Sequence, residues 1–157
     1  MSDRSTTTID GREVLVEDHE FAFPYERSPG PVLGRFLGGL KDKQIAGVRG
    51  SDGRVLVPPV EYDPKTSAEL DEFVPVGTAG VVTAWSWVEQ PRAKHPLDSP
   101  FAWALILLDG ADTPMLHVVA AATRGEITTG MRVQAQWRDE RTGSIRDLAC
   151  FVPEGKR

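Results

Sequence analysis

Two pairs of positions near the middle of the chain have the spacing of a structural zinc site but the wrong residue types. Such a site holds the metal with four cysteine thiolates, two in a C-x-x-C-G turn and two in a C-P-x-C turn after a short strand. The first pair of positions holds Arg49 and Asp52, ahead of a glycine, and the second holds Asp63 and Thr66 around a proline. These side chains cannot rebuild a site of soft thiolates, so the sequence predicts that no metal is bound there.

The same four residues allow two other arrangements. Asp52 and Asp63 would face each other across the two turns, where a hard cation could bind between carboxylates. The two turns contain no further carboxylate, so we favour an ion pair of Arg49 with Asp52 or Asp63. Ionic and hydrogen bonds would then replace the zinc crosslink.

A second group of polar residues lies in the loop Glu89–Pro100, between two predicted strands. Arg92, Lys94 and His95 make this loop locally basic, and these side chains could contact the phosphates of a ligand or simply be solvated. The C-terminal part is basic as well, through Arg124, Arg132, Arg138, Arg141 and Arg146. An uneven charge distribution of this kind can steer an acidic partner or ligand.

Sequence motifs of catalysis are absent from the chain. It contains no G-x-S-x-G, H-E-x-x-H, P-loop or G-x-G-x-x-G sequence. Cys150 lies in a predicted strand among apolar residues and is expected to be a buried core thiol. The three histidines have no ligand spacing. The sequence therefore predicts that the chain has no catalytic residues and binds no cofactor of its own.

Three tryptophans, Trp85, Trp87 and Trp103, fall in predicted strands. Exposed aromatic side chains on a barrel can stack the bases of single-stranded nucleic acid, whereas buried ones belong to the core and its interfaces. The net charge of −5 and the pI near 5.2 oppose binding of a phosphate backbone. We therefore favour the core and interface assignment.

The chain has 157 residues, enough for a small barrel with an appendage. Its single cysteine excludes an intramolecular disulfide. The longest apolar run, Phe101–Leu108, is about a third of a membrane span, and the polar start lacks the apolar segment of a signal peptide. We expect a cytoplasmic protein that does not contact a membrane.

The sequence of the first 40 or so residues predicts a flexible arm followed by a short helix. Residues 1–20 are polar and are expected to be flexible, and a proline at position 31 suits the first turn of a helix. An apolar stripe follows at helical spacing: Leu33, Phe36, Leu37 and Leu40. Three glycines weaken this helix, so its stripe must lie against another surface. That surface is either the protein's own barrel or a partner.

The last part of the chain predicts strands. Five segments rich in apolar and β-branched residues are separated by turn signals, and they are Gly77–Val88, Phe101–Leu108, Met115–Ala122, Met131–Arg138 and Leu148–Val152. Five strands of this length fit a small closed barrel. The segment between the third and fourth is too short for more than one helical turn.

Three stretches in order carry a resemblance to a known family: S-P-G-P-V-L-G-R-F-L-G-G-L, the zinc-site outline, and G-M-R-V-Q-A-Q-W followed by C-F-V-P. Over about residues 21–153 the chain resembles the acyl-CoA-associated OB-fold family, domain-of-unknown-function family thirty-five. The resemblance implies a mainly β fold with an N-terminal helical arm (1–44), a degenerate rubredoxin-like zinc ribbon (45–72) and a five-stranded OB-fold barrel (73–157). The chain departs from the family in lacking all four zinc cysteines.

The resemblance also implies a function. Members of the family are similar to non-catalytic partners of thiolase-fold enzymes, including the partner domain of steroid side-chain aldolases. The chain would form a heterotetramer with a lipid-transfer-protein-like aldolase or a thiolase and help form its acyl-CoA channel, with acyl-CoA as substrate of the complex. Arg92, Lys94 and His95 would lie nearest coenzyme A. The partner interface would consist of Leu33, Phe36, Leu37, Leu40, Val55 and Val57. The alternative is a single-stranded nucleic-acid-binding OB-fold protein.

Overall fold

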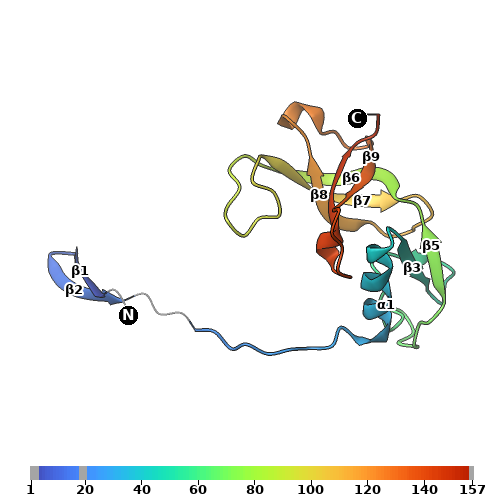
Figure 1. Ribbon diagram of the computed structural model, residues 1–157, viewed down its shortest axis with the longest axis horizontal. Helices are drawn as coiled ribbons and strands as arrows, with labels where there is room; N and C mark the ends of the chain where they lie inside the picture. The colour runs from blue at the N-terminus through green and yellow to red at the C-terminus, as the bar shows by residue number, and fades with distance from the viewer. Residues whose placement is uncertain (1–3, 18–20, 156–157) are drawn as a thin grey trace.

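The computed structural model describes residues 4–17 and 21–155. They form the helix α1 (Gly30–Lys41), two short 3-10 helices, η1 (Arg124–Glu126) and η2 (Ile145–Asp147), and ten strands (Figure 1). The strands are β1 (Arg4–Ile9), β2 (Arg12–Glu17), β3 (Ile45–Arg49), β4 (Val55–Leu56), β5 (Phe73–Val76), β6 (Ala79–Val88), β7 (Phe101–Leu108), β8 (Met115–Ala120), β9 (Arg132–Trp137) and β10 (Leu148–Pro153). Within these ranges, no helix is both long enough and apolar enough to cross a membrane.

The five predicted strands of the last part form a closed barrel in the order β10-β8-β7-β6-β9, which confirms the mainly β fold. Strand β7 has the predicted bounds because its apolar run is buried on both faces over most of its length. The barrel interior is filled by apolar side chains, among them Val82, Ile106, Val119 and Phe151. The link between β8 and β9 contains the single turn η1, as its length predicts.

The barrel closes through a narrow seam between β8 and β10. These two strands run parallel and share one paired position, Phe151 opposite Val119. Beyond it they separate, and β10 continues along β9 from Leu148 to Pro153. Among the described residues, no strand pairs with this edge of β8 over Leu116–Val118, and the cavity described below lies there.

The ribbon consists of β3, β4, β5 and their connections, with β3 in the middle of a three-stranded sheet. Gly47 in β3 is required because a Cβ there would lie 2.6 Å from the backbone oxygen of Leu56. Strand β5 begins at Phe73, the predicted first residue of the barrel, but it pairs with β3 from Phe73 to Val76. The ribbon sheet thus extends four residues past the predicted boundary.

Helix α1 packs on the protein's own core. Val32, Phe36 and Leu40 are its buried residues, and the last two belong to the same cluster as the barrel interior. Leu33 is 37% exposed, so the buried stripe is turned by one residue from the predicted one. The C-terminus of α1 is also tied to the barrel, since Arg141 Nε donates to the backbone oxygen of Lys41 at 2.7 Å.

The prediction of a flexible arm is wrong for residues 4–17, which form a β-hairpin. Asp10 and Gly11 make its two-residue turn, with φ of 49° and 74°, the conformation that lets the strands keep their twist. The flanking strands are rich in threonine and valine, which favour extended backbone. Residues 1–3 and 18–20 of the predicted arm lie outside the described residues. In Figure 1 the hairpin lies apart from the barrel, beyond an extended segment.

Candidate functional site

The two turns of the ribbon are joined by the carboxylate of Asp63, which is only 3% exposed. One of its oxygens accepts a hydrogen bond from the backbone N–H of Ser51, in the first turn, at 2.7 Å. The other accepts from Lys65 at 2.7 Å and from Thr66 at 2.9 Å, both in the second turn. These backbone donors, that of Ser51 most strongly, hold the pKa of Asp63 well below its ordinary value. A negative carboxylate thus joins the turns that four thiolates and a zinc ion would join.

Asp52 strengthens this crosslink from the first turn. Its carboxylate forms ion pairs with Arg54 at 2.7 Å and with Lys65 at 2.8 Å, and these partners lower its pKa, Lys65 most strongly. The turns come so close that a Cβ on Gly50 would lie 3.2 Å from an oxygen of Asp63 and 3.3 Å from one of Asp52. Both carboxylates therefore converge on one small region.

Arg49 does not pair with Asp52 or Asp63, so that prediction is wrong. Its Nε lies 2.7 Å from a carboxylate oxygen of Glu72, and its Nη1 donates to the backbone oxygen of Gly53 at 3.1 Å. The reason is the register of the sheet, which brings the backbone of Arg49 within hydrogen-bonding distance of Glu72. Ionic and hydrogen bonds do connect the turns, but through partners that the spacing alone does not identify.

A hard cation between the two aspartates is disfavoured by these contacts. The described residues contain no group of three or more histidine, cysteine, aspartate or glutamate side chains suited to a metal ion. The oxygens of Asp63 already accept three backbone hydrogen bonds, and Asp52 is engaged by two cations. That the chain holds no zinc remains a prediction.

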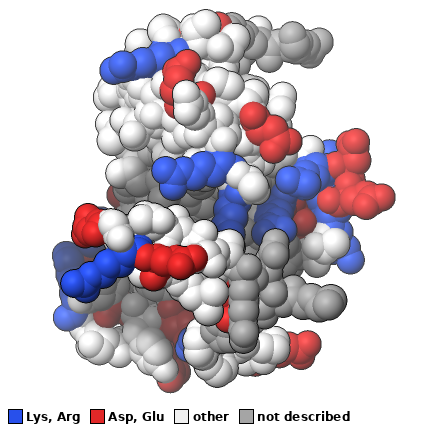
Figure 2. All heavy atoms as spheres, turned by 90° about the vertical axis from the view of Figure 1, so that its left-hand side faces the viewer, with Lys and Arg blue, Asp and Glu red and all other residues white. Residues whose placement is uncertain are grey.

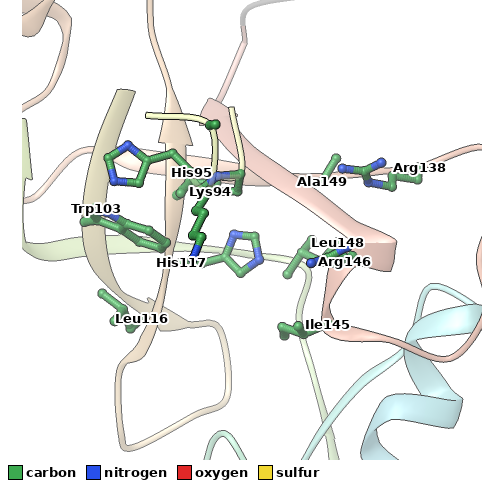
Figure 3. Close-up of a pocket in the computed structure, with 13 residues that line it drawn as sticks. Lys94, His95, Trp103, Leu116, His117, Arg138, Ile145, Arg146, Leu148 and Ala149 are labelled. Atoms are coloured by element: carbon green, nitrogen blue, oxygen red, sulfur yellow. The ribbon is translucent and has the colours of Figure 1, made fainter. Parts of the chain in front are cut away.

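A cavity of about 750 Å³ opens at the seam between β8 and β10, and we refer to it as the seam cavity. It is lined by Ala93, Lys94, His95, Pro96, Trp103, Leu116, His117, Val118, Arg138, Ile145, Arg146, Leu148 and Ala149. Figure 3 shows Lys94, His95, Trp103 and Leu116 on one side and the labelled residues of the C-terminal part on the other, with the His117 ring between them. The cavity thus joins the basic loop to the last strands.

The charges of the seam cavity are all of one sign. Lys94, Arg138 and Arg146 line it, and no aspartate or glutamate does. The side chains of these three residues form no ion pair within residues 4–17 and 21–155. Figure 2, which looks onto the left-hand face of Figure 1, shows lysine and arginine side chains gathered across its middle. An acidic chain therefore carries a concentrated basic region on one face.

The predicted loop residues divide between the cavity and the surface. Lys94 and His95 line the seam cavity, whereas Arg92 does not. His95 is held in place because its Nδ1 accepts from the backbone N–H of Arg92 at 3.0 Å and its ring lies edge-on to Phe101 at 5.5 Å. The sequence indicates that Arg138 and Arg146 are basic residues but does not place them near the loop, since they follow Lys94 by 44 and 52 residues.

His117 is the unusual polar residue of the cavity. Its side chain is 9% exposed, its ring contacts Phe151 edge-on at 5.6 Å, and its Nδ1 is buried without a hydrogen-bond partner among the described residues. Burial lowers the pKa of His117, against a smaller opposite contribution from the backbone of Val118. The imidazole is therefore neutral at pH 7, and one of its nitrogens lacks the partner that buried polar atoms usually have.

Four of the six predicted interface residues are buried inside the chain, so their assignment to a partner surface is wrong in this fold. These are Phe36, Leu40, Val55 and Val57, all members of the main core cluster. The physical reason is that the ribbon and α1 pack against the barrel and not away from it. Leu33, which is partly exposed, and Leu37, which packs at the edge of that cluster, remain predictions.

The tryptophans and the cysteine singled out in the sequence are packed within the fold. Trp85 and Trp87 pack partly against the core, and Trp87 Nε1 donates to the carboxylate of Glu89 at 2.6 Å. Cys150 is buried, as predicted, and burial raises the pKa of its thiol. A thiol in that state is a poor nucleophile.

Comparison with known proteins supports the OB fold. Residues 73–138 match the family model for the C-terminal OB-fold domain of ChsH2. A protein of unknown function from the DUF35 family of Sulfolobus solfataricus is 22% identical, with 68% of this chain and 78% of that chain covered and a TM-score of 0.54. A chain of the Ltp2-ChsH2(DUF35) aldolase is 18% identical, with 82% and 98% covered and a TM-score of 0.60. A comparison with curated proteins gave no match. The barrel segment 73–138 is thus similar to the ChsH2 OB-fold domain, and the chain shares its fold with proteins of the DUF35 family.

Proposed function

We propose that this chain is a non-catalytic accessory subunit that binds a thiolase-fold, lipid-transfer-protein-like aldolase or a thiolase and helps form its acyl-CoA channel. The observation that carries this proposal is the match of the barrel segment to the ChsH2 OB-fold domain. A chain of the Ltp2-ChsH2(DUF35) aldolase also shares the fold over 98% of its length. The acyl-CoA would come from steroid side-chain or related degradation, and the assembly would be a heterotetramer in the cytoplasm.

The partner would contact the exposed apolar side chains that precede and begin α1. Phe21, Phe23 and Tyr25 are 78–80% exposed and lie in the extended segment before the helix. Leu33 follows on the outer face of α1. Large exposed aromatic side chains in a row are typical of surfaces that a second protein covers.

Co-purification with a thiolase-fold aldolase encoded beside this chain tests the proposal. Leu33→Asp should remove the partner from the complex, whereas Leu105→Asp should retain it. The two leucines are matched, since each is 37% exposed, but Leu105 lies on β7 of the barrel. Circular dichroism checks that both variants are folded. If the wild-type chain retains no aldolase, the accessory function is wrong. If Leu33→Asp retains as much aldolase as the wild-type chain, Leu33 is not part of the contact.

The kinetics of the complex test the acyl-CoA channel. The chain alone should turn over no acyl-CoA, because the described residues offer no nucleophile paired with a base. Lys94→Ala should raise the KM of the complex for acyl-CoA more than it lowers kcat, as expected for lost ground-state binding. Arg92→Ala is the matched control, since Arg92 lies two residues away but outside the seam cavity. Equal KM values for both variants and wild type would return the loop to a solvated role.

The alternative of single-stranded nucleic-acid binding lacks support from the aromatic residues. Trp85 and Trp87 border a hollow together with Glu89 and Arg124, so the hollow has one charge of each sign. The carboxylate of Glu89 accepts a hydrogen bond from the Trp87 ring nitrogen. A hollow without an excess of positive charge, on a chain with a net charge of −5, does not favour a phosphate backbone. Retention of the chain on single-stranded DNA at low salt would reverse this preference.

A further inference from the structure

We propose that the N-terminal hairpin (β1 and β2, residues 4–17) of one copy of this chain docks on the basic face of a second copy, and that two copies exchange their hairpins in a symmetric dimer. The basic face is the surface that carries Lys94, Arg138 and Arg146, which line the seam cavity. The proposal concerns the chain without a partner enzyme, so it does not depend on the proposed function.

The hairpin has no packing surface on its own chain. Every residue from 5 to 17 is exposed except Val14, which is partly buried. No residue of the hairpin belongs to a core cluster of the described chain, and residues 21–29, which lead to α1, are exposed as well. A two-stranded hairpin is only marginally stable in water, because it needs a third strand or another surface to cover it. We therefore expect that surface to come from another molecule.

The exposed area of the chain leads to the same expectation. Its solvent-accessible surface is 10895 Å², whereas a compact monomer of 17.2 kDa exposes about 7,800 Å². The excess of roughly 3,000 Å² is larger than the area of about 1,600 Å² that a specific protein–protein interface buries. An arm that covers a second copy would remove much of this excess from water.

Charge indicates which surface the hairpin fits. Residues 1–29 contain seven acidic and three basic side chains, so they carry −4 of the net charge of −5. On the basic face, Lys94, Arg138 and Arg146 form no ion pair among the described residues, and no carboxylate lines their cavity. Surfaces of opposite sign attract each other and disfavour wrong partners. The arm and the basic face are therefore complementary.

The acidic residues nearest the basic face do not neutralise it. Asp139 and Glu140 border a neighbouring hollow together with the two arginines, but no ion pair joins them within the described part of the chain. The carboxylate of Asp147 accepts hydrogen bonds from the backbone N–H groups of residues 142–144. These bonds fix η2, so Arg146 is presented from a rigid turn and not from a free loop.

Apolar side chains on the two surfaces are complementary as well. Leu15 in β2 is 67% exposed, and strand alternation places it on the same face as Glu13 and Glu17. On the basic face, Leu116 and Ile145 are 59% and 43% exposed beside the three cations. An apolar centre surrounded by charged residues is typical of protein–protein interfaces.

The backbone at the seam can also accept a strand. Among the described residues, no strand pairs with the edge of β8 at the seam over Leu116–Val118. An open strand edge is a template for pairing with an extended segment of another chain, and β2 is such a segment. This pairing would give the hairpin the third strand that it lacks.

The placement of the arm favours a second copy over the same chain. Figure 1 shows the hairpin on the left, the side that faces the viewer in Figure 2, where lysine and arginine side chains gather. Pro24 and Pro29 restrict the backbone of the connecting segment and oppose its folding back. Two copies that face each other through this side can each reach the other's basic face, and the symmetry forms the contact twice.

Sedimentation velocity of the full chain, without an aldolase and at low salt, tests the proposal. The wild-type chain should form a dimer, and added salt should weaken it, because salt screens exposed charges. Two variants, Glu13→Lys/Glu17→Lys in the arm and Arg138→Glu/Arg146→Glu on the basic face, reverse one surface each. Each should raise the dissociation constant of the dimer by about tenfold or more, since like charges then meet in both contacts.

A mixture of the two variants is the sharpest measurement. In a mixed dimer, the lysines of one arm meet the glutamates of the other chain's face, while the unchanged arm meets the unchanged face. The dimer should therefore re-form, which also shows that both variants are folded. Glu69→Lys/Asp71→Lys is the matched control, because it changes the charge equally at two exposed residues of the ribbon. It should leave the dissociation constant unchanged.

A wild-type chain that stays monomeric would overturn the proposal, and so would a mixture of the two variants that does not dimerise. If the wild-type chain is monomeric and only Glu13→Lys/Glu17→Lys loses the aldolase, the hairpin contacts the enzyme and not a second copy. The sedimentation assay contains no aldolase, so its failure leaves the co-purification test of the proposed function unaffected.

Discussion

In the ribbon, Asp52 and Asp63 are each held by cations or backbone N–H groups of the same chain, whereas in the seam cavity three cations have no carboxylate partner within the described residues. The first arrangement is closed: its charges satisfy one another, and they take the place of a metal crosslink. The second is open, because none of its three cations forms an ion pair among the described residues. The difference separates charges that maintain the fold from charges that are available for function.

The closed arrangement should be convertible back into a metal site. Replacing Arg49, Asp52, Asp63 and Thr66 together with cysteine should yield a chain that holds one zinc ion, because the turns still converge around Gly50. The wild-type chain purified without chelator should contain no stoichiometric zinc. Elemental analysis measures both, and a chelator should lower the Tm of the variant alone. A zinc-free variant would show that the turns have lost the geometry of a thiolate site.

Removal of Asp63 should cause the largest loss of stability among single substitutions in the ribbon. Asp63→Ala removes a buried carboxylate and leaves three backbone donors without their acceptor, and we expect the Tm to fall by roughly 5–10 °C. Amide hydrogen exchange should accelerate at Ser51, Lys65 and Thr66.

The pH dependence of that loss has a definite sign. The folded-state pKa of Asp63 lies below its ordinary value of 3.8, so its stabilising contribution is complete above that value and is lost as the pH falls further. The Tm gap between wild type and Asp63→Ala should therefore stay constant from pH 7 to pH 5 and narrow only in stronger acid. If the Tm difference narrowed near pH 6, the loss of stability would have to come from a group other than the Asp63 carboxylate.

The stability of the chain should also depend on pH in a higher range, because of the buried His117 in the seam cavity. Its folded-state pKa lies below the ordinary 6.5, so the unfolded chain binds a proton that the folded chain does not, and stability falls as the pH drops below about 6.5. Relative to His117→Leu, the Tm of the wild-type chain should decrease by no more than roughly 3–5 °C per pH unit. Thermal unfolding between pH 5 and pH 8 measures this, and parallel curves for the two chains would contradict it.

The smallest effect should come from the exposed ion pair of Arg49 with Glu72. Both side chains are more than a third exposed, and pairs of this kind contribute little to stability. Glu72→Ala should change the Tm by less than about 2 °C. A larger change would mean that Arg49 belongs to the closed arrangement as an essential member and not at its margin.

The sequence predicted the barrel strands well because each carries its own pattern. Phe101–Leu108 is a continuous apolar run with turn residues on both sides, so its bounds depend on local signals alone. The hairpin depends on an equally local signal, the turn residues Asp10-Gly11 between two segments with β-branched residues. The helix was found, but its buried face was turned by one residue because Val32 and Leu33 are equally apolar.

The site was less predictable because its contacts join distant parts of the chain. Arg49 and Glu72 meet only through the register of β3 with β5. Lys94 lines the same cavity as Arg138 and Arg146 only because β8 and β10 share no more than one paired position. Spacing in the sequence identified the residue types at the zinc positions, but it could not identify their partners.

Strand β10 follows the other four barrel strands in the sequence, yet it lies between β8 and β9 in the closed barrel. The barrel therefore cannot close until β10 has been synthesised. Pairings between distant segments form slowly, because a long loop must be ordered before its contacts stabilise it. During that interval Phe36 and Leu40 have no complete barrel to cover them. A nascent chain with this strand order exposes its apolar helix until β10 is available, and during that interval it is most prone to aggregate and most dependent on a chaperone.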